Sequence, residues 1–177
     1  MVQMIQNGVQ LAQTAAASSA DNNSNKYVVA SIGCYGAALA DGSEYKGNYN
    51  ISKDQLKDFY RRKVRLLAHG CQHPPDAIAF ETIPCGMEVD AIMELLHEQR
   101  ITVPCWISLA CCNDSQLNDG TEVTVVLKMI QQLDPDSKLL AAIGINCCDS
   151  QYIHGLVSKL ISNTIDPCMF PPRAIVI

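Results

Sequence analysis

Five short apolar runs recur along the chain from residue 27 onward, and segments with a helical spacing of apolar positions separate them. The runs are rich in Val, Ile, Leu and Ala, as is typical of parallel strands that helices cover. They are Tyr27–Ile32, Ala77–Phe80, Val103–Leu109, Leu139–Ile145 and Arg173–Ile177. The alternation of strands with helices predicts βαβ units and therefore an α/β fold.

The clearest predicted helix begins at Ser52, where Gln55 three residues later completes a capping box. Its apolar side chains recur as far as Leu67, and Gly70 stands where a terminating glycine is expected. Residues 18–26 are polar and rich in turn formers, so we expect a loop between a first helix and the first strand. The other helices are predicted over residues 1–17, 89–96, 123–133 and 153–161.

Two architectures fit this order of elements: an open doubly wound sheet and a (β/α)8 barrel. A barrel needs about 250 residues. The chain has 177 residues, and only five strands can be counted in it. The pattern alone therefore favours the open sheet. The last apolar run has no covering helix after it, however, so we also expect that the chain is part of a larger unit.

Composition narrows the class of protein. Hydrophobic residues make up 48% of the chain, enough for a buried core and too many for a disordered protein. The formal net charge of −5 argues against binding to nucleic acid or to anionic lipid, because both depend on Lys and Arg. No stretch reaches the roughly 18 apolar residues of a membrane helix. Residues 1–25 contain no Lys or Arg, so no signal or transit peptide is predicted and we expect a cytoplasmic protein.

Nine cysteines are present, an odd number without a secretion signal, which indicates reduced thiols in the cytosol. We expect most of them to be small buried apolar side chains. No CxxC spacing marks a zinc site. The four histidines are expected on the surface: His69, His73, His97 and His154.

Candidate chemistry gathers where the predicted strands end, the edge at which α/β proteins place their sites. Glu81 directly follows an apolar strand and could bind a cationic group such as an ammonium, or could cap the next loop. Cys147 ends another strand and is either functional or one more buried thiol. The segment Ser31–Gly36 lacks the further glycine and lysine of a phosphate-binding loop.

Four blocks of sequence resemble the homocysteine S-methyltransferase family. VASIGCYGA followed by LADGSEY, within residues 29–45, is close to the family signature GSIGPYGA…LADGSEY. AFETIP (79–84), WIS (106–108) with DGT (119–121), and GINC (144–147) with IHGL (153–156) match later blocks in the same order. The likeness covers nearly the whole chain from about residue 3 onward.

The resemblance implies a (β/α)8 TIM barrel that transfers a methyl group to homocysteine, giving methionine. In this family zinc holds homocysteine as a thiolate, which attacks the methyl group of a donor such as S-methylmethionine. By position, Cys147 matches a zinc ligand and Glu81 matches the residue that binds the homocysteine amino group. The remaining matches line the substrate pocket: Asn146, Ser31, Gly33 and Tyr35. The first block is most similar to the S-methylmethionine-type enzymes and so favours a sulfonium donor, but the likeness does not decide between sulfonium, betaine and cobalamin-dependent donors.

By the same alignment, residues 1–177 form a partial homocysteine-binding barrel domain, from about strand 3 to strand 7. The family's other two zinc ligands are an adjacent Cys pair in a GGCCG block, which we expect beyond Ile177, so we expect the chain alone to be inactive. Two alternatives stay open. One is a truncated isoform or non-catalytic module that pairs with a missing complement or with a copy of itself, through open strand edges near Val28–Ile32 and Arg173–Ile177. The other is a redox or metal-buffering role for the adjacent thiols.

Overall fold

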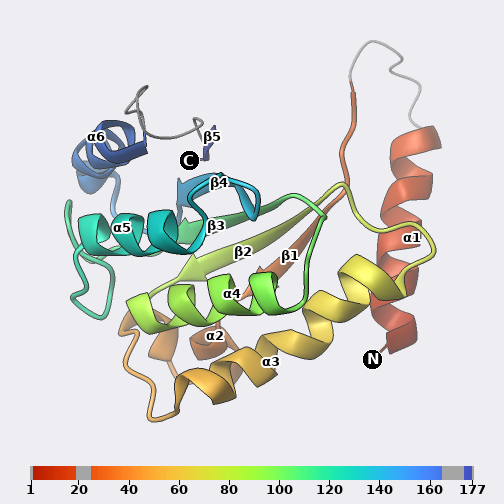
Figure 1. Cartoon of the computed structure of the whole chain (residues 1–177), viewed down its shortest axis with the longest axis horizontal. Coiled ribbons are helices and arrows are strands. Elements are labelled where there is room, and N and C mark those ends of the chain that lie inside the picture. The colour runs from red at the N-terminus through yellow and green to blue at the C-terminus, as the bar shows by residue number, and fades with distance from the viewer. Residues whose placement is uncertain (1, 19–24, 165–173, 177) are drawn as a thin grey trace.

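The computed structural model describes every residue except 1, 19–24, 165–173 and 177. Its centre is one parallel sheet of five strands in the spatial order β1-β2-β3-β4-β5 (Figure 1). This order is sequential, as in consecutive units of a barrel, and does not reverse as in a doubly wound sheet. The strands are β1 (Val29–Gly33), β2 (Ala77–Ile83), β3 (Cys105–Leu109), β4 (Leu140–Ile145) and β5 (Ala174–Val176).

The predicted strands are confirmed in number and place, with shifted ends. The largest difference is at β2, which we expected to end at Phe80 but which continues to Ile83. Glu81 is therefore part of the strand, and its backbone pairs with Gly33 of β1. In β3, Val103 and Pro104 precede the strand, although the Pro104 carbonyl still accepts a hydrogen bond from Ile78. The first and last residues of the expected run 173–177 lie outside the described residues.

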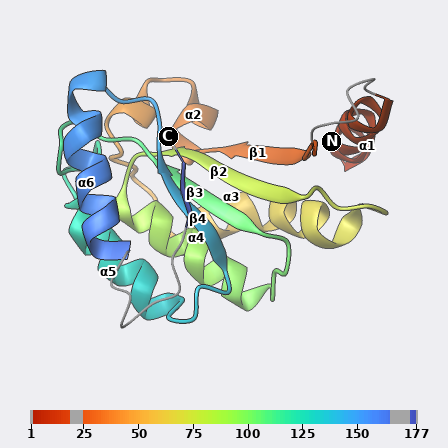
Figure 2. The same cartoon turned by 90° about the horizontal axis from the view of Figure 1, so that it is seen from above.

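Helices follow the strands and cover one face of the curved sheet (Figures 1 and 2). A short helix after β1 was not predicted, because five residues are too few for a recognisable periodicity. The described helices are α1 (Val2–Ser18), α2 (Tyr35–Leu39), α3 (Lys53–Arg65), α4 (Gly86–Glu98), α5 (Val123–Leu133) and α6 (Ile153–Thr164). Short 3-10 turns lie at Ser43–Tyr45 and Ser150–Tyr152. None of the helices in the described part of the chain is long and apolar enough to cross a membrane.

Helix α3 begins as predicted, since the Ser52 side chain accepts from the Gln55 N–H and the Gln55 side chain accepts from the Ser52 N–H. Its end differs from the prediction. A π-helical turn, Leu66–Gly70, extends the helix. Gly70 is the last residue of that turn and lacks the left-handed backbone of a terminating glycine. Helix α1 packs against this turn, where the Gln6 side chain donates to the Gly70 carbonyl.

The core lies between the sheet and the helices. The predicted stripe of α4 is fully buried there, at Val89, Ile92, Met93 and Leu96. The sheet and the helices thereby enclose one continuous apolar layer. The carboxyl ends of the strands lie at one edge of this layer, and we call that edge the rim.

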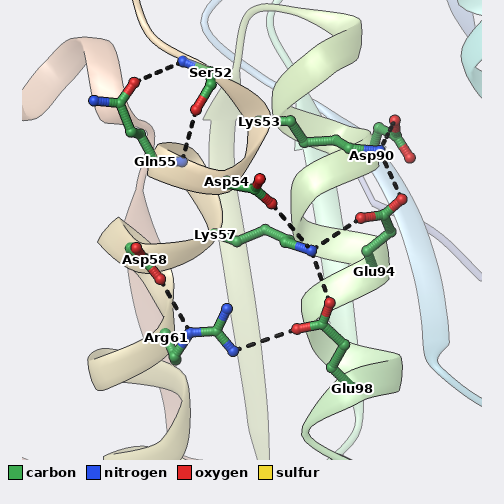
Figure 3. A network of polar contacts seen from close by, with 10 residues as sticks. All are labelled: Ser52, Lys53, Asp54, Gln55, Lys57, Asp58, Arg61, Asp90, Glu94 and Glu98. Carbon is green, nitrogen blue, oxygen red and sulfur yellow. Dashed lines mark hydrogen bonds and ion pairs between the residues drawn. The ribbon is translucent and has the colours of Figure 1, made fainter.

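Ion pairs join α3 to α4 on the outer surface (Figure 3). Lys53 bridges Asp90 and Glu94, at 3.0 and 2.6 Å. Lys57, whose side chain is only 11% exposed, bridges Glu94 and Glu98 at 3.2 and 2.7 Å. Because these residues recur every three or four positions on two adjacent helices, they set the helix register without touching the rim.

Candidate functional site

A carboxylate at the rim is held between β1 and β2. The Ser31 hydroxyl donates a 2.9 Å hydrogen bond to Glu81 Oε2. Parallel pairing explains the contact, because Gly33 lies opposite Glu81 and Ser31 lies two residues earlier on the same face of β1. Glu81 is partly buried, and a carboxylate in this position can bind a cationic group.

A β-bulge shapes this end of β2. Phe80 pairs with Ile107 and Ile83 pairs with Leu109, so three steps along β2 match two steps along β3. The additional residue lies in the Glu81–Thr82 segment. Bulges bend a strand and redirect its side chains, and they recur beside active sites.

The end of β4 carries the second predicted group of residues. The Thr82 N–H donates to Asn146 Oδ1 at 3.1 Å, and Asn146 Nδ2 donates to Thr82 Oγ1 at 3.2 Å. The Thr82 hydroxyl lies 3.5 Å from the sulfur of Cys147. These contacts span 64 and 65 residues of sequence and pass over the end of β3. Thr82, the chain neighbour of Glu81, therefore contacts both Asn146 and Cys147.

The thiols differ sharply in exposure. Cys147 is exposed at the rim and Cys148 is partly buried. Burial raises the pKa of Cys105 and of Cys111 to about 12, so both are inert thiols at neutral pH. Four of the eight described cysteines are buried, namely Cys34, Cys85, Cys105 and Cys111, and none of the eight forms a disulfide. The expected buried role thus holds for half of them.

The positions of the His, Cys, Asp and Glu side chains show whether the described residues could hold a metal ion. Among the described residues, no three His, Cys, Asp or Glu side chains gather closely enough to hold a metal ion. The expected surface positions of His69, His73, His97 and His154 are confirmed, as all four are exposed. A protein zinc site needs three or four ligands, and the described residues do not bring that many together.

The ring of Tyr35, another predicted pocket residue, lies among aromatic side chains. Its ring packs edge-on against Tyr49 and Phe59, with centroids 5.2 and 5.3 Å away. Its backbone N–H donates to Glu88 at 2.6 Å. The structure therefore brings Ser31, Gly33 and Glu81 together at the rim and turns the Tyr35 side chain toward α3.

Glu88 is a fully buried carboxylate that we did not single out from the sequence. It accepts hydrogen bonds from the hydroxyls of Tyr60 and Tyr49, the second at 3.0 Å. Burial raises its pKa, and the Tyr60, Tyr35 and Tyr49 hydrogen bonds partly oppose that effect. One signal was available: Glu88 lies four residues before Ile92 and thus on the buried face of α4.

The DGT block also has a clear role in the structure. Asp119 accepts a 3.0 Å hydrogen bond from the Gly86 N–H at the start of α4. It also accepts from the Thr121 N–H and hydroxyl, both at 2.8 Å. The residue before α4, Cys85, makes no side-chain capping bond itself. Asp119 therefore caps the helix from a distant loop.

Comparisons with known proteins point to one family. A family model described as homocysteine S-methyltransferase matches residues 1–175. Homocysteine S-methyltransferase 1 of Zea mays is 41% identical over 139 residues, which are 77% of this chain and 41% of the relative. Selenocysteine methyltransferase of Astragalus bisulcatus is 34% identical over 172 residues, 92% of this chain and 49% of the relative. The chain thus spans less than half the length of these relatives.

A solved structure shares the fold. The homocysteine methyltransferase MmuM from Escherichia coli, in its metallated form, superposes with a TM-score of 0.81 at 30% sequence identity. The match covers 97% of this chain and 58% of that protein. Five sequential parallel strands with intervening helices therefore fit an incomplete (β/α)8 barrel, and the open doubly wound sheet that the pattern alone favoured is wrong.

Proposed function

Because the chain belongs to the homocysteine S-methyltransferase family, we propose that its rim binds homocysteine and serves methyl transfer to the homocysteine sulfur. The observation that supports this proposal is the Glu81–Thr82–Cys147 arrangement. It places a carboxylate at the end of β2 and an exposed thiol after β4, with Thr82 next to the first in the chain and in contact with the second. Homocysteine is an amino acid with a thiol side chain, and its cationic amine can bind to the Glu81 carboxylate.

The proposed roles follow from the chemistry of each group. Glu81, held by Ser31, accepts the ammonium group of homocysteine, and Asn146 lines the pocket beside it. In the reaction a bond forms between the homocysteine sulfur and the methyl carbon while the bond from that carbon to the donor breaks. With S-methylmethionine as donor the leaving group is a neutral thioether, so no general acid is needed. Betaine-type and cobalamin-dependent donors are the alternatives.

We also propose that Cys147 is one ligand of a zinc ion whose other ligands lie outside the described residues. The described donor set does not complete such a site. We therefore expect the purified chain to hold less than one zinc per molecule and to form no methionine from homocysteine and S-methylmethionine. Stoichiometric zinc that is lost in Cys147→Ala, together with methionine formation, would overturn this expectation.

Homocysteine binding tests the role of Glu81 without turnover. Calorimetry of the chain with homocysteine should show binding that weakens about tenfold or more in Glu81→Gln, because a charge-assisted hydrogen bond contributes about 1.5–3 kcal/mol. Glu122→Gln is the matched control, since Glu122 is exposed and only accepts from Gln116. Equal affinity of the Glu81 variant and the control would contradict the proposal.

A second candidate function is self-association through the edge of β1. A groove of about 380 Å³ runs along Val28–Gly33, and Ile5, Val9 and Ala12 of α1 form its other wall. An edge strand with such a groove is a template for another strand. We expect concentration-dependent dimers in analytical ultracentrifugation, and fewer of them in Val29→Lys. The control is Val125→Lys, an exposed valine on α5. A monomer at all concentrations would exclude this function.

A further inference from the structure

We propose that Thr82 is a positioning residue that sets the direction of the Cys147 thiol relative to Glu81. The inference rests on the proposed function for the roles of Cys147 and Glu81. The contacts that support the inference are present without substrate, and the experiment that tests it uses none.

The β-bulge is the first step of the argument. It takes the Thr82 N–H out of the regular pairing of β2, so this donor needs another partner. It finds one in the side chain of Asn146, whose Oδ1 accepts at 3.1 Å. The β4 end is held in turn by the Asn146 N–H, which donates to the Leu109 carbonyl at 3.1 Å.

This contact determines which way the Asn146 amide faces. A backbone N–H can only donate, so the atom of Asn146 that faces it must be the oxygen. The Nδ2 group then points to Thr82 Oγ1, 3.2 Å away, and donates to it. A hydroxyl has a single hydrogen. With the amide donating to its oxygen, the Thr82 hydroxyl directs that hydrogen to the Cys147 sulfur at 3.5 Å.

The backbone at both ends of this contact is unusual. Thr82 has a φ of 62° and Cys147 has a φ of 50°, both in the left-handed region. Neither residue is a glycine, and a β-branched residue rarely adopts this conformation. Such strained residues persist where the surrounding contacts hold them, and they cluster at functional sites. Here the two strained residues contact one another across the end of β3.

This hydrogen bond constrains the separation between the Cys147 thiol and the Glu81 carboxylate. Thr82 is adjacent to Glu81 in β2, so the hydrogen bond to Cys147 links the thiol to the strand end that carries the carboxylate. A substrate with an amine at one end and sulfur at the other needs these two groups at a constant separation. Thr82 supplies that constraint without touching substrate itself.

The test is the side-chain conformation of Cys147, measured by NMR three-bond couplings that report its χ1 angle. The wild-type chain and Thr82→Ser, which keeps the hydroxyl, should show one staggered rotamer. Thr82→Val keeps the shape but removes the hydroxyl, so the couplings should become averaged over the staggered wells. The protons of the Asn146 side-chain amide should also exchange with water faster in this variant than in the wild type.

Two further variants complete the design. Thr121→Val is the matched control, because the Thr121 hydroxyl donates to Asp119 instead of Cys147, and it should leave the Cys147 couplings unchanged. Asn146→Asp serves where Thr82→Val does not fold. It removes the amide donor and offers a carboxylate acceptor, so the Thr82 hydroxyl turns away from Cys147 and the couplings should average. A Cys147 side chain that is averaged in the wild type, or that keeps one rotamer in folded Thr82→Val or Asn146→Asp, overturns the proposal. Weak homocysteine binding with the expected couplings would count against the proposed function alone.

Discussion

The backbone N–H of Tyr35 donates a 2.6 Å hydrogen bond to the carboxylate of Glu88, which follows it by 53 residues. Tyr35 begins α2 after β1, whereas Glu88 lies in the first turn of α4 after β2. Tyr49 extends the link, since its hydroxyl donates to Glu88 and accepts from the Gly36 N–H at 3.1 Å. A buried carboxylate outside the rim thus positions the loop that follows Ser31 and Gly33.

We expect Tyr60→Phe to lower the free energy of unfolding by about 1–3 kcal/mol, because it removes a donor from the buried Glu88 carboxylate. Urea denaturation measures the change. Tyr45→Phe is the control: Tyr45 is 71% exposed, and its loss should stay within about 0.5 kcal/mol. Equal losses in both variants would show that the Glu88 hydrogen bonds contribute nothing net.

The pH dependence of the free energy of unfolding should reveal the raised pKa of Glu88. Burial raises its pKa above the ordinary 4.5, so the folded state binds the proton more tightly than the unfolded state. Its contribution to stability is therefore complete below the ordinary pKa and is lost as pH rises through the raised pKa. Glu88→Gln stays neutral throughout. The stability of the wild type minus that of Glu88→Gln should fall as pH rises above the ordinary carboxyl pKa, by about 1.4 kcal/mol per unit of pKa rise. A difference that grows with pH would contradict the sign.

Gly36→Ala should destabilise the chain by about 1–3 kcal/mol through overpacking. A Cβ at Gly36 would lie 2.5 Å from the backbone nitrogen of Glu44 and 2.8 Å from its Cα, and backbone atoms there cannot turn aside. Gly8→Ala is the matched control in helix α1, where a Cβ meets nothing within 4 Å. Alanine should stabilise that helix by about 0.5–1 kcal/mol. Thermal unfolding of both variants would separate the effects, and a neutral Gly36→Ala would disprove the close approach.

Glu94→Gln should cost about 0.5–1 kcal/mol, since Glu94 is partly exposed and pairs with Lys53 and Lys57. Its pKa is lowered, first by the Lys53 hydrogen bond, so this stability is present above the ordinary carboxyl pKa and is lost as pH falls through the lowered value. Added salt should shrink the difference from wild type. Asp136→Asn, at a pair with 77% and 65% exposed side chains, should change nothing measurable. A salt-independent loss would indicate packing instead of charge.

The local pattern of apolar and polar residues was sufficient to predict the strands and the main helices. Apolar runs and stripes predicted all five strands and the helices that carry the core, because periodic burial is written into neighbouring positions. It was insufficient for α2, which is held by the distant Glu88 and Tyr49. The capping box at Ser52 was predictable, since both partners lie within one helical turn.

The sequence by itself determined the α/β class, the strand and helix segments and, through its ordered blocks, the family. It also pointed to Glu81, Asn146 and Cys147 as residues at strand ends. Only the tertiary structure decided that Thr82 contacts Asn146 and Cys147 and that the Tyr35 ring packs against Tyr49 and Phe59. The reason is physical: the strand register and one bulge in β2 bring together groups 64 or 65 residues apart, and neither feature leaves a local periodic signal.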